Sequence, residues 1–519
     1  MKSHGIATCL GAALVLARLA TAASYFVSTT GSDSAAGTSA APWKSLQHAA
    51  DVVGPGDSVT VRAGNYTGFY LDTSGTAAAP ISFIAEPGVL INQRNATTPD
   101  GINLEGASFI LVDGFSVSGM PRAGVRSVGF PEDFAEFVTV RNVTATNNGN
   151  WGIFTGHVND LLIESNSTSG SINEHGIYVS NSGDRPVIRN NVSFGNRSNG
   201  IHMNGDLSQG GDGIITGAIV SGNTIYNNGA GGGSGINMDG VQNSRIENNL
   251  IYNNHASGIS LYQIDGGAGS SGNVVANNTI VAASDARWAL NIQSGSTNNT
   301  VRNNILLNNH PSRGAIDISA DSLPGFSSDY NAVISRFTQT GGDSTLSLTQ
   351  WQAATGSDLH SLVATAAQLF VNAAANDYHL KALSPAINMG TNSSAPPADL
   401  SGLPRPAAGV VDIGAYEYGA IAGDFNRDGS VTAADYILWR NSQGATTTRY
   451  AGADGDGSGT IDPADYARWR ANFAAMAAGA PSGIGAAIPE PPAAVCAAPL
   501  FAILLALRRN TLLRFDLRG

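Results

Sequence analysis

Apolar and polar residues alternate in many short segments between residues 100 and 320. The apolar positions of three such segments are Ile177 and Val179, Ile201 and Met203, and Ile236 and Met238. Alternation with a period of two predicts β-strands, and the Gly, Asn and Ser residues between segments are typical of turns. Helical periodicity is absent from this region. The pattern therefore predicts a chain of short strands joined by turns.

These strands belong to a repeat whose units start with a Gly-Ile pair or a close variant. The pairs are Gly101-Ile102, Gly124-Val125, Gly152-Ile153, Gly176-Ile177, Gly200-Ile201, Gly235-Ile236, Gly258-Ile259, Ala289-Leu290 and Ala315-Ile316. An apolar-x-Asn-Asn-apolar phrase runs in step, as at 188–192, 246–250 and 301–305. Most units follow each other after about 23 to 35 residues, the range of solenoid repeats. Units this short must stack on their neighbours to bury an apolar face.

The repeat predicts an all-β fold, a single-stranded parallel β-helix, in which asparagines at the turns stack as hydrogen-bonded ladders. An opening strand is expected at 24–31 and a cap helix at 43–53, covering the open end of the stack. Regular coils are expected to about residue 329. Residues 330–418 predict less regular terminal rungs with an insertion near 346–362.

The stretch 24–418 resembles the pectate-lyase-like right-handed parallel β-helix superfamily. The resemblance lies in the opening Tyr25-Phe26-Val27-Ser28, the segment Trp43-Lys44-Ser45-Leu46, the Gly-Ile and Asn-Asn rungs, and the closing Asp412-Ile413-Gly414-Ala415-Tyr416. It implies the fold rather than one reaction, because that superfamily contains polysaccharide lyases, glycoside hydrolases, uronate epimerases and non-catalytic surface proteins.

Composition narrows the class of partner. The chain has 519 residues, 63 of them glycine, a net charge of -12, and only 13% charged residues. An acidic balance argues against nucleic acid as a partner. The chain is long enough for one large domain with small appendages.

Both terminal segments have the pattern of processing signals. Residues 1–22 predict a secretory signal peptide, with Lys2, an apolar run and a small-residue cleavage site. Residues 488–509 contain Pro489-Glu490-Pro491, an apolar stretch at 493–507 and the pair Arg508-Arg509. They resemble a PEP-CTERM sorting signal, which implies transient membrane anchoring and a sorting protease; the alternative is a plain C-terminal membrane anchor. The protein is therefore expected to be secreted, extracellular or at the cell surface. Because Cys9 and Cys496 both lie in these terminal segments, no disulfide framework is expected in the folded domain.

Two acidic loops in 423–475 predict calcium binding. Oxygen ligands occupy positions 1, 3, 5, 7, 9 and 12 of each loop, and a glycine occupies position 6. The first loop offers Asp424, Asn426, Asp428, Ser430, Thr432 and Asp435, and the second offers Asp454, Asp456, Ser458, Thr460, Asp462 and Asp465. Two Ca²⁺ ions are therefore expected here.

Each loop leads into a helix with the same Asp-Tyr-x-x-Trp-Arg phrase, starting at Asp435 and at Asp465. The pair resembles a dockerin type I module, an α-helical, EF-hand-like unit. This resemblance implies a cohesin-like module on another protein as the partner. The alternative is a calcium-bound spacer without a partner. A linker is predicted at 476–487.

Alignment on the Gly-Ile pairs predicts which side chains share an exposed face. If each Ile points inward, the next residue points outward. The resulting column reads Asn103, Arg126, Phe154, Tyr178, His202, Asn237, Ser260, Asn291 and Asp317; two residues further on, a second reads Glu105, Gly156, Ser180, Asn204, Asp239, Tyr262, Gln293 and Ser319. Such a strip suits an extended polymer, and we predict substrate binding by Arg126, Phe154, Asn204, Asn237 and Tyr262.

The central rungs hold the densest polar set. Breaking a uronate chain by elimination requires a cation that neutralises the carboxylate, a base and an acid. Arg185 or Arg126 is a candidate cation, and a further Ca²⁺ on Asp206 and Asp239 is another. The chain's lysines are Lys2, Lys44 and Lys381, so a lysine base is not expected in these rungs.

Proton transfer is assigned to His202 or Tyr178, with His175 as a partner. The leading hypothesis is a secreted polysaccharide lyase, or related epimerase, acting on uronate-containing extracellular glycans. One alternative is a non-catalytic glycan-binding or matrix adhesion protein. The other is a glycoside hydrolase, for which Asp206 and Asp239 are the candidate carboxylic acids.

Overall fold

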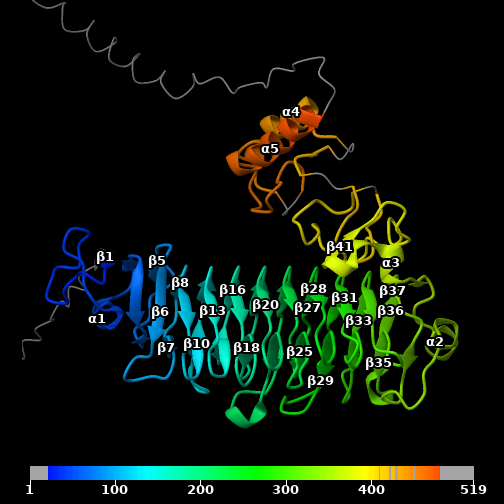
Figure 1. Cartoon of the computed structure of the whole chain (residues 1–519), viewed down its shortest axis with the longest axis horizontal. Helices are drawn as coiled ribbons and strands as arrows, with labels where there is room; N and C mark the ends of the chain where they lie inside the picture. Colours follow the sequence, from blue (N-terminus) through cyan, green and yellow to red (C-terminus); the bar gives the residue numbers. More distant parts are fainter. Residues whose placement is uncertain (1–21, 408, 420–421, 427–429, 448–450, 480–519) are drawn as a thin grey trace, which may run out of the picture.

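The computed structural model describes residues 22–407, 409–419, 422–426, 430–447 and 451–479. From residue 24 to residue 363 the chain coils into an all-parallel β-solenoid (Figure 1). Two long sheets have 12 strands and the third has 11, so the solenoid has about 12 turns. The signal peptide predicted at 1–22 falls, except for its last residue, outside the described residues, as does the segment 488–509.

Sheet A contains β1 (Ser24–Val27), β2 (Ser58–Val61), β5 (Ile81–Ala85), β8 (Ile110–Asp113), β12 (Val138–Arg141), β16 (Leu162–Glu164), β19 (Val187–Arg189), β23 (Ile219–Ser221), β27 (Arg245–Glu247), β30 (Val274–Ala276), β33 (Thr300–Arg302) and β36 (Ser327–Asp329). Sheet B contains β3 (Gly64–Thr67), β6 (Val89–Gln93), β9 (Ser116–Ser118), β13 (Thr144–Thr146), β17 (Ser167–Ser169), β20 (Val192–Phe194), β24 (Thr224–Tyr226), β28 (Leu250–Tyr252), β31 (Thr279–Ala282), β34 (Ile305–Asn308), β37 (Ala332–Val333) and β39 (Leu362–Val363).

Sheet C contains β4 (Phe69–Leu71), β7 (Ile102–Glu105), β10 (Ala123–Val128), β14 (Trp151–Gly156), β18 (Ile177–Ser180), β21 (Ile201–Asn204), β25 (Ile236–Asp239), β29 (Ile259–Tyr262), β32 (Leu290–Ile292), β35 (Ile316–Ile318) and β38 (Phe337–Thr338). Short pairs are β11 (Ala135–Glu136) with β15 (Val158–Asn159), β22 (Ile215–Thr216) with β26 (Val241–Gln242), and the antiparallel β40 (Phe370–Asn372) with β41 (Asp377–Leu380).

The core is the interior of the coil. The isoleucines of the repeat stack in register and are fully buried, as at Ile153, Ile177, Ile201, Ile236 and Ile259. The predicted inward direction of these side chains is confirmed. Each strand is too short to be stable alone, so stacking supplies the burial that holds it.

An asparagine ladder fixes one corner of the coil. The side-chain amide Nδ2 of each member donates to Oδ1 of the next, over 2.9 to 3.2 Å. The members are Asn166, Asn191, Asn223, Asn249, Asn278, Asn304 and Asn331. The predicted ladder is thus confirmed, and it keeps successive rungs in one register because a slip would break every link.

Most of the small helices lie near the ends of the coil. Helix α1 (Leu46–Val52) is capped by Ser45 and packs on β4. Helix α2 (Leu348–Thr355) lies in the expected insertion, and its Trp351 stacks on Phe337 at 5.0 Å between ring centroids. Shorter helices are α3 (Ala366–Leu369), η1 (Leu207–Gln209), η2 (Ala320–Ser322) and η3 (Ala373–Ala375).

The segment 384–418 crosses the outer side of the coil as a strap. The Asn277 side chain donates to the carbonyls of Asp412 and Gly414, and the Ala415 N–H donates to the Thr279 hydroxyl over 2.9 Å. Gly414 has a φ of 105°, and a Cβ there would lie 2.6 Å from Ile305. The closing Asp-Ile-Gly-Ala-Tyr phrase therefore fits the strap closely against the rungs.

Two helices follow the strap, α4 (Ala433–Ser442) and α5 (Pro463–Gly479), the second extending into the stretch predicted as a linker. Their tryptophans cross over: Trp439 Nε1 donates to the Asp462 carbonyl and Trp469 Nε1 to the Thr432 carbonyl, each over 2.8 Å. Within the described residues, none of the helices has the length and hydropathy required to span a bilayer.

Candidate functional site

The outward face of sheet C carries the predicted columns in register. Phe154 pairs with Tyr178, Tyr178 with His202, and His202 with Asn237. The second column is confirmed from Gly156 to Tyr262 through Ser180, Asn204 and Asp239. The residues that lie side by side on the sheet are therefore those that the Gly-Ile alignment predicts.

Aromatic rings form a continuous row across the central rungs. Trp151 stacks on Phe154 with 4.3 Å between centroids, and Phe154 meets Tyr178 edge-on at 5.3 Å. Tyr178 stacks on His202 at 4.7 Å and 5° between ring planes. The sequence alignment missed Trp151 because it directly precedes the Gly-Ile pair, and the alignment considered only positions after that pair. A further column for the residue before each pair would have included it.

A backbone donor fixes the protonation of the two histidines. The Asn199 N–H donates to His175 Nδ1 over 3.2 Å, so that nitrogen accepts and Nε2 carries the proton of neutral His175. His175 Nε2 lies 3.0 Å from His202 Nδ1, which must then be the acceptor. The remaining nitrogen, His202 Nε2, carries the second proton and has no hydrogen-bond partner among the described side chains and backbone groups.

Burial opposes charge on this cluster. It lowers the pKa of His175 to about 3, and burial followed by the neighbouring His175 lowers the pKa of His202 well below its usual value. Burial also raises the pKa of the Tyr178 phenol. Around neutral pH all three are uncharged, so His202 and Tyr178 are proton donors in the resting protein, and neither histidine supplies positive charge.

The candidate arginines already have partners. Arg126 forms an ion pair with Glu105, donates to Asn103 Oδ1 over 3.0 Å and lies 6.0 Å from the Phe154 ring centroid. It is on the predicted face, next to the aromatic row. Arg185 lies off the strands, in the turn before β19, where a half-exposed pair with Asp160 holds it at 2.8 Å. The structure therefore does not place Arg185 in the outward columns.

Loops 205–214 and 263–269 project from this side of sheet C and contact each other; in Figure 1 they extend below β18, β25 and β29. The Leu207 N–H donates to the Asp265 carbonyl over 2.9 Å. The carboxylate of Asp239 anchors the second loop by accepting the N–H groups of Ile264, Asp265 and Gly266. Asp239 is 1% exposed, so its role in this structure is structural.

The remaining predicted residues are linked by hydrogen bonds on this face. Asn204 Nδ2 donates to the Tyr178 hydroxyl over 3.3 Å, and Asn204 Oδ1 accepts the Asp206 N–H. Asp206 is half-exposed, and its negative charge is among the causes of the raised Tyr178 pKa. Asn237 Nδ2 donates to the Tyr262 hydroxyl over 2.7 Å. Asn204, Tyr178 and Asp206 thus form one connected group.

Comparison with known proteins supports the fold. Residues 25–279 match the family described as "Pel9A-like, right handed beta helix region". The fold is a pectate-lyase-like right-handed β-helix. The solved structure titled "Crystal structure of pectate lyase Pel9A" superposes with a TM-score of 0.54 at 17% identity, covering 76% of this chain and 96% of that one.

Two other solved structures superpose with lower TM-scores. A rhamnogalacturonan lyase gives a TM-score of 0.43 at 16% identity, covering 56% of this chain and 84% of that one. An alginate lyase from Paenibacillus sp. str. FPU-7 gives 0.42 at 19% identity, covering 52% and 94%. No curated protein matches the sequence significantly.

Beyond the pectate-lyase-like β-helix, the second acidic loop brings carboxylates together. Ligand oxygens of Asp454, Asp456 and Asp465 all lie within 4.8 Å of one another. Asp465 is fully buried and also accepts the N–H of Gly455 over 2.7 Å. An all-oxygen donor set of this kind fits Ca²⁺. In the first loop Asp435 holds the equivalent place, accepting the Asn426 N–H, while Asp428 lies outside the described residues.

Proposed function

We propose that this protein cleaves a uronate-containing extracellular polysaccharide by β-elimination on the outer face of sheet C. The observation that carries the proposal is the aromatic row Trp151, Phe154, Tyr178 and His202, which runs across the three adjacent strands β14, β18 and β21. Rungs of a parallel sheet are about 4.8 Å apart, so the row offers a long strip to an extended chain. Aromatic side chains with polar neighbours suit sugar rings, which have apolar faces and hydroxyl edges.

The chemistry follows from the proton positions. In β-elimination a base removes the proton at C5, the C5–H electron pair forms the C4=C5 double bond, and the C4–O bond breaks. The departing oxygen takes a proton from an acid. Tyr178 serves as this acid, because its raised pKa keeps the phenol protonated.

Asp206 is assigned as the base, since it is the half-exposed carboxylate of the group that Asn204 links to Tyr178. Arg126, beside the strip, is the residue assigned to the uronate carboxyl group, and His202 contributes its ring to the aromatic row. His175 is a positioning residue that fixes the tautomer of His202. The hydrolase alternative is weaker, because the Asp239 carboxylate is occupied by three backbone N–H groups.

The non-catalytic alternative also has an observation in its favour. Arg126, Arg185 and Asp239 all have intramolecular partners, as expected of side chains that stabilise a binding surface. On this reading the strip holds a glycan without breaking it, as an adhesion or matrix protein does.

The two readings give different products. We expect the full chain, incubated with polygalacturonate, alginate and neutral glycans, to generate the ultraviolet absorbance of an unsaturated uronate from an acidic glycan only. New reducing ends without that absorbance would mean hydrolysis. Binding of the acidic glycan with neither signal would establish the adhesion alternative.

We further propose that residues 423–475 form a dockerin-like module that binds two Ca²⁺ ions and a cohesin-like partner. The support is the oxygen cluster of Asp454, Asp456 and Asp465 together with the reciprocal tryptophan bonds of α4 and α5. The alternative is a spacer that binds calcium but no partner; mixing the calcium-loaded chain with a cohesin module on a sizing column separates the two.

Calcium should stabilise this module. At 100 times its dissociation constant, an ion that binds only the folded form adds about 2.7 kcal/mol to the free energy of unfolding. We expect EGTA to lower the unfolding temperature of the module, followed by tryptophan fluorescence, and Asp465→Ala to remove most of the calcium response. A matched change of an acidic residue outside the loops, Asp343→Ala, should leave the response intact. Equal unfolding with and without calcium would contradict the site.

Secretion is proposed from the sequence pattern of residues 1–22, and sorting to the cell surface from residues 488–509. Mass determination of the protein recovered from the medium and from the envelope tests both, because each processing step removes a defined mass.

A further inference from the structure

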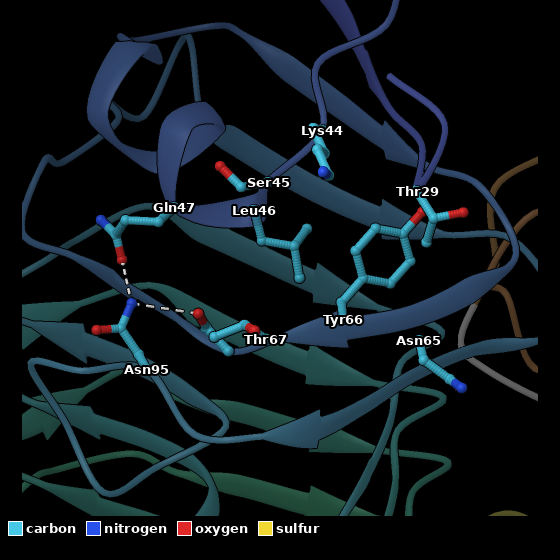
Figure 2. A pocket seen from close by; sticks show the side chains of 10 residues that line it. Thr29, Lys44, Ser45, Leu46, Gln47, Asn65, Tyr66, Thr67 and Asn95 are labelled. Carbon is cyan, nitrogen blue, oxygen red and sulfur yellow. Dashed lines mark hydrogen bonds between the residues drawn. The ribbon is translucent and has the colours of Figure 1, made fainter. Parts of the chain in front are cut away.

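We propose that a cleft at the N-terminal end of the β-helix binds a carboxylated sugar unit, separately from the strip on sheet C. The cleft has a volume of about 400 Å³. It lies where the start of helix α1, the turn after β1 and strand β3 meet (Figure 2). Strand β18, which carries Tyr178, is four strands further along sheet C than β4. At about 4.8 Å per rung, the two sites are separated by roughly 19 Å along the axis.

The cleft contains a lysine without an ion-pair partner. Lys44 is exposed and lines the cleft, and among the described residues no ion pair involves it. Arg62 and Arg94 of the described residues form no ion pair either, but Lys44 is the one charged residue among those that line the cleft. On a protein with a net charge of -12, an unpaired ammonium group in a concave site favours an anion.

Backbone donors face the same space. Strand β3 is the edge strand of sheet B, paired only with β6 in that sheet. The N–H groups of Gly64 and Gly68 donate toward the β6 side, to Gly88 and Gln93. Since parallel strands direct alternate residues to opposite sides, the backbone N–H groups of Asn65 and Thr67 point to the open edge. Both residues line the cleft.

The rest of the cleft is fixed in shape. Leu46 and the Tyr66 ring are buried and form an apolar base, and the Tyr66 hydroxyl donates to the Arg62 carbonyl over 2.7 Å. One wall is held by Asn95 Nδ2, which donates to Gln47 Oε1 over 2.6 Å, as Figure 2 shows. A preformed site costs little ordering on binding.

These features select the ligand class. An ammonium group with outward N–H donors recognises a carboxylate, the side chains of Thr29, Asn65 and Thr67 suit hydroxyl groups, and Leu46 with Tyr66 suits the apolar face of a ring. The carboxylate follows from the cleft itself. The choice of a sugar as its carrier rests on the function proposed for sheet C.

The test uses the full chain and two probes that differ by one charge, galacturonate and its methyl ester, with affinities measured by titration calorimetry. Lys44→Met removes the ammonium and keeps the chain length. Arg94→Gln is the matched control, because Arg94 is exposed at the same end and does not line the cleft. His202→Ala disables the strip on sheet C.

We expect Lys44→Met to weaken galacturonate binding about fivefold or more and to leave the weak binding of the ester unchanged. Arg94→Gln should bind galacturonate as the wild type does, and His202→Ala should keep the binding that depends on Lys44. The inference is overturned if the wild type does not bind galacturonate, if Lys44→Met binds it normally, if Arg94→Gln weakens it equally, or if His202→Ala alone abolishes binding. Lyase activity is assayed on the same samples. A protein that shows no lyase activity but binds galacturonate through Lys44 would contradict the proposed reaction and leave the proposed cleft intact.

Discussion

Tyr178→Phe should lower kcat on the acidic glycan by a factor of about 100 to 10,000, the usual contribution of a general acid. The substitution removes the hydroxyl that Asn204 contacts and keeps the ring that stacks on His202. Sugar binding to the aromatic row should therefore persist, and KM should change little. The measurement is the initial rate of unsaturated product over a range of substrate concentrations.

The chain offers a matched control for this change. Tyr226 is stacked between Phe194 and Tyr252 on sheet B, at 4.9 Å from each, and is half-exposed like Tyr178. Tyr226→Phe deletes the same atom from a stacked tyrosine on another face and should leave the rate unchanged. If both variants keep full activity, Tyr178 is not the acid; if both lose it, the loss reflects the stability of the coil.

The repeat explains why so much of the face was predictable. A buried Ile in every rung sets the direction of the following residues, and a one-residue slip would turn every side chain over. Tyr178, His202 and Asn237 are therefore adjacent by register alone. The asparagine ladder was predictable for the same reason, because its members occupy one corner of successive turns.

What each side chain does was less predictable, because its partners come from outside the repeat. Asp239 is in the expected column, yet the loop at 263–269, whose length the repeat does not set, occupies its carboxylate. Arg185 lies in a turn whose direction the strand pattern does not fix. The acceptor role of His175 Nδ1 depends on the Asn199 backbone, one rung away.

The site also has a physical advantage from its position. Tyr178 and His202 lie on strands held by neighbours on both sides, so their stacking does not depend on a mobile loop. Asp206 is in a loop, but its N–H is bonded to Asn204 at the end of β21. Proton transfer requires groups held within a fraction of an ångström, which rigid strands supply.

Arg405→Met should be the most destabilising single change in the strap, costing about 3 to 5 kcal/mol of the free energy of unfolding. Arg405 and its partner Glu417, 3.1 Å away, both have side chains with no exposure. Burial raises the pKa of Asp399 and of Asp412, and the positive charge of Arg405 acts on both carboxyl groups. Removing the cation leaves these carboxylates buried without countercharge. Thermal unfolding and hydrogen exchange of residues 384–418 measure the loss.

The half-exposed pair Arg141 with Asp113 is the control, and Arg141→Met should cost about 1 kcal/mol or less. The pH dependence gives a second check. Burial raises the pKa of Glu417 to about 7, above its unfolded value, so the folded state binds the proton more tightly and this group stabilises the fold at low pH. That contribution disappears as pH rises through 7. Without Arg405 the pKa of Glu417 rises further, because Arg405 lowers it in the wild type. The variant should therefore lose more stability at pH 8 than at pH 5. An equal loss at both pH values would show that the cost comes from lost packing rather than from buried charge.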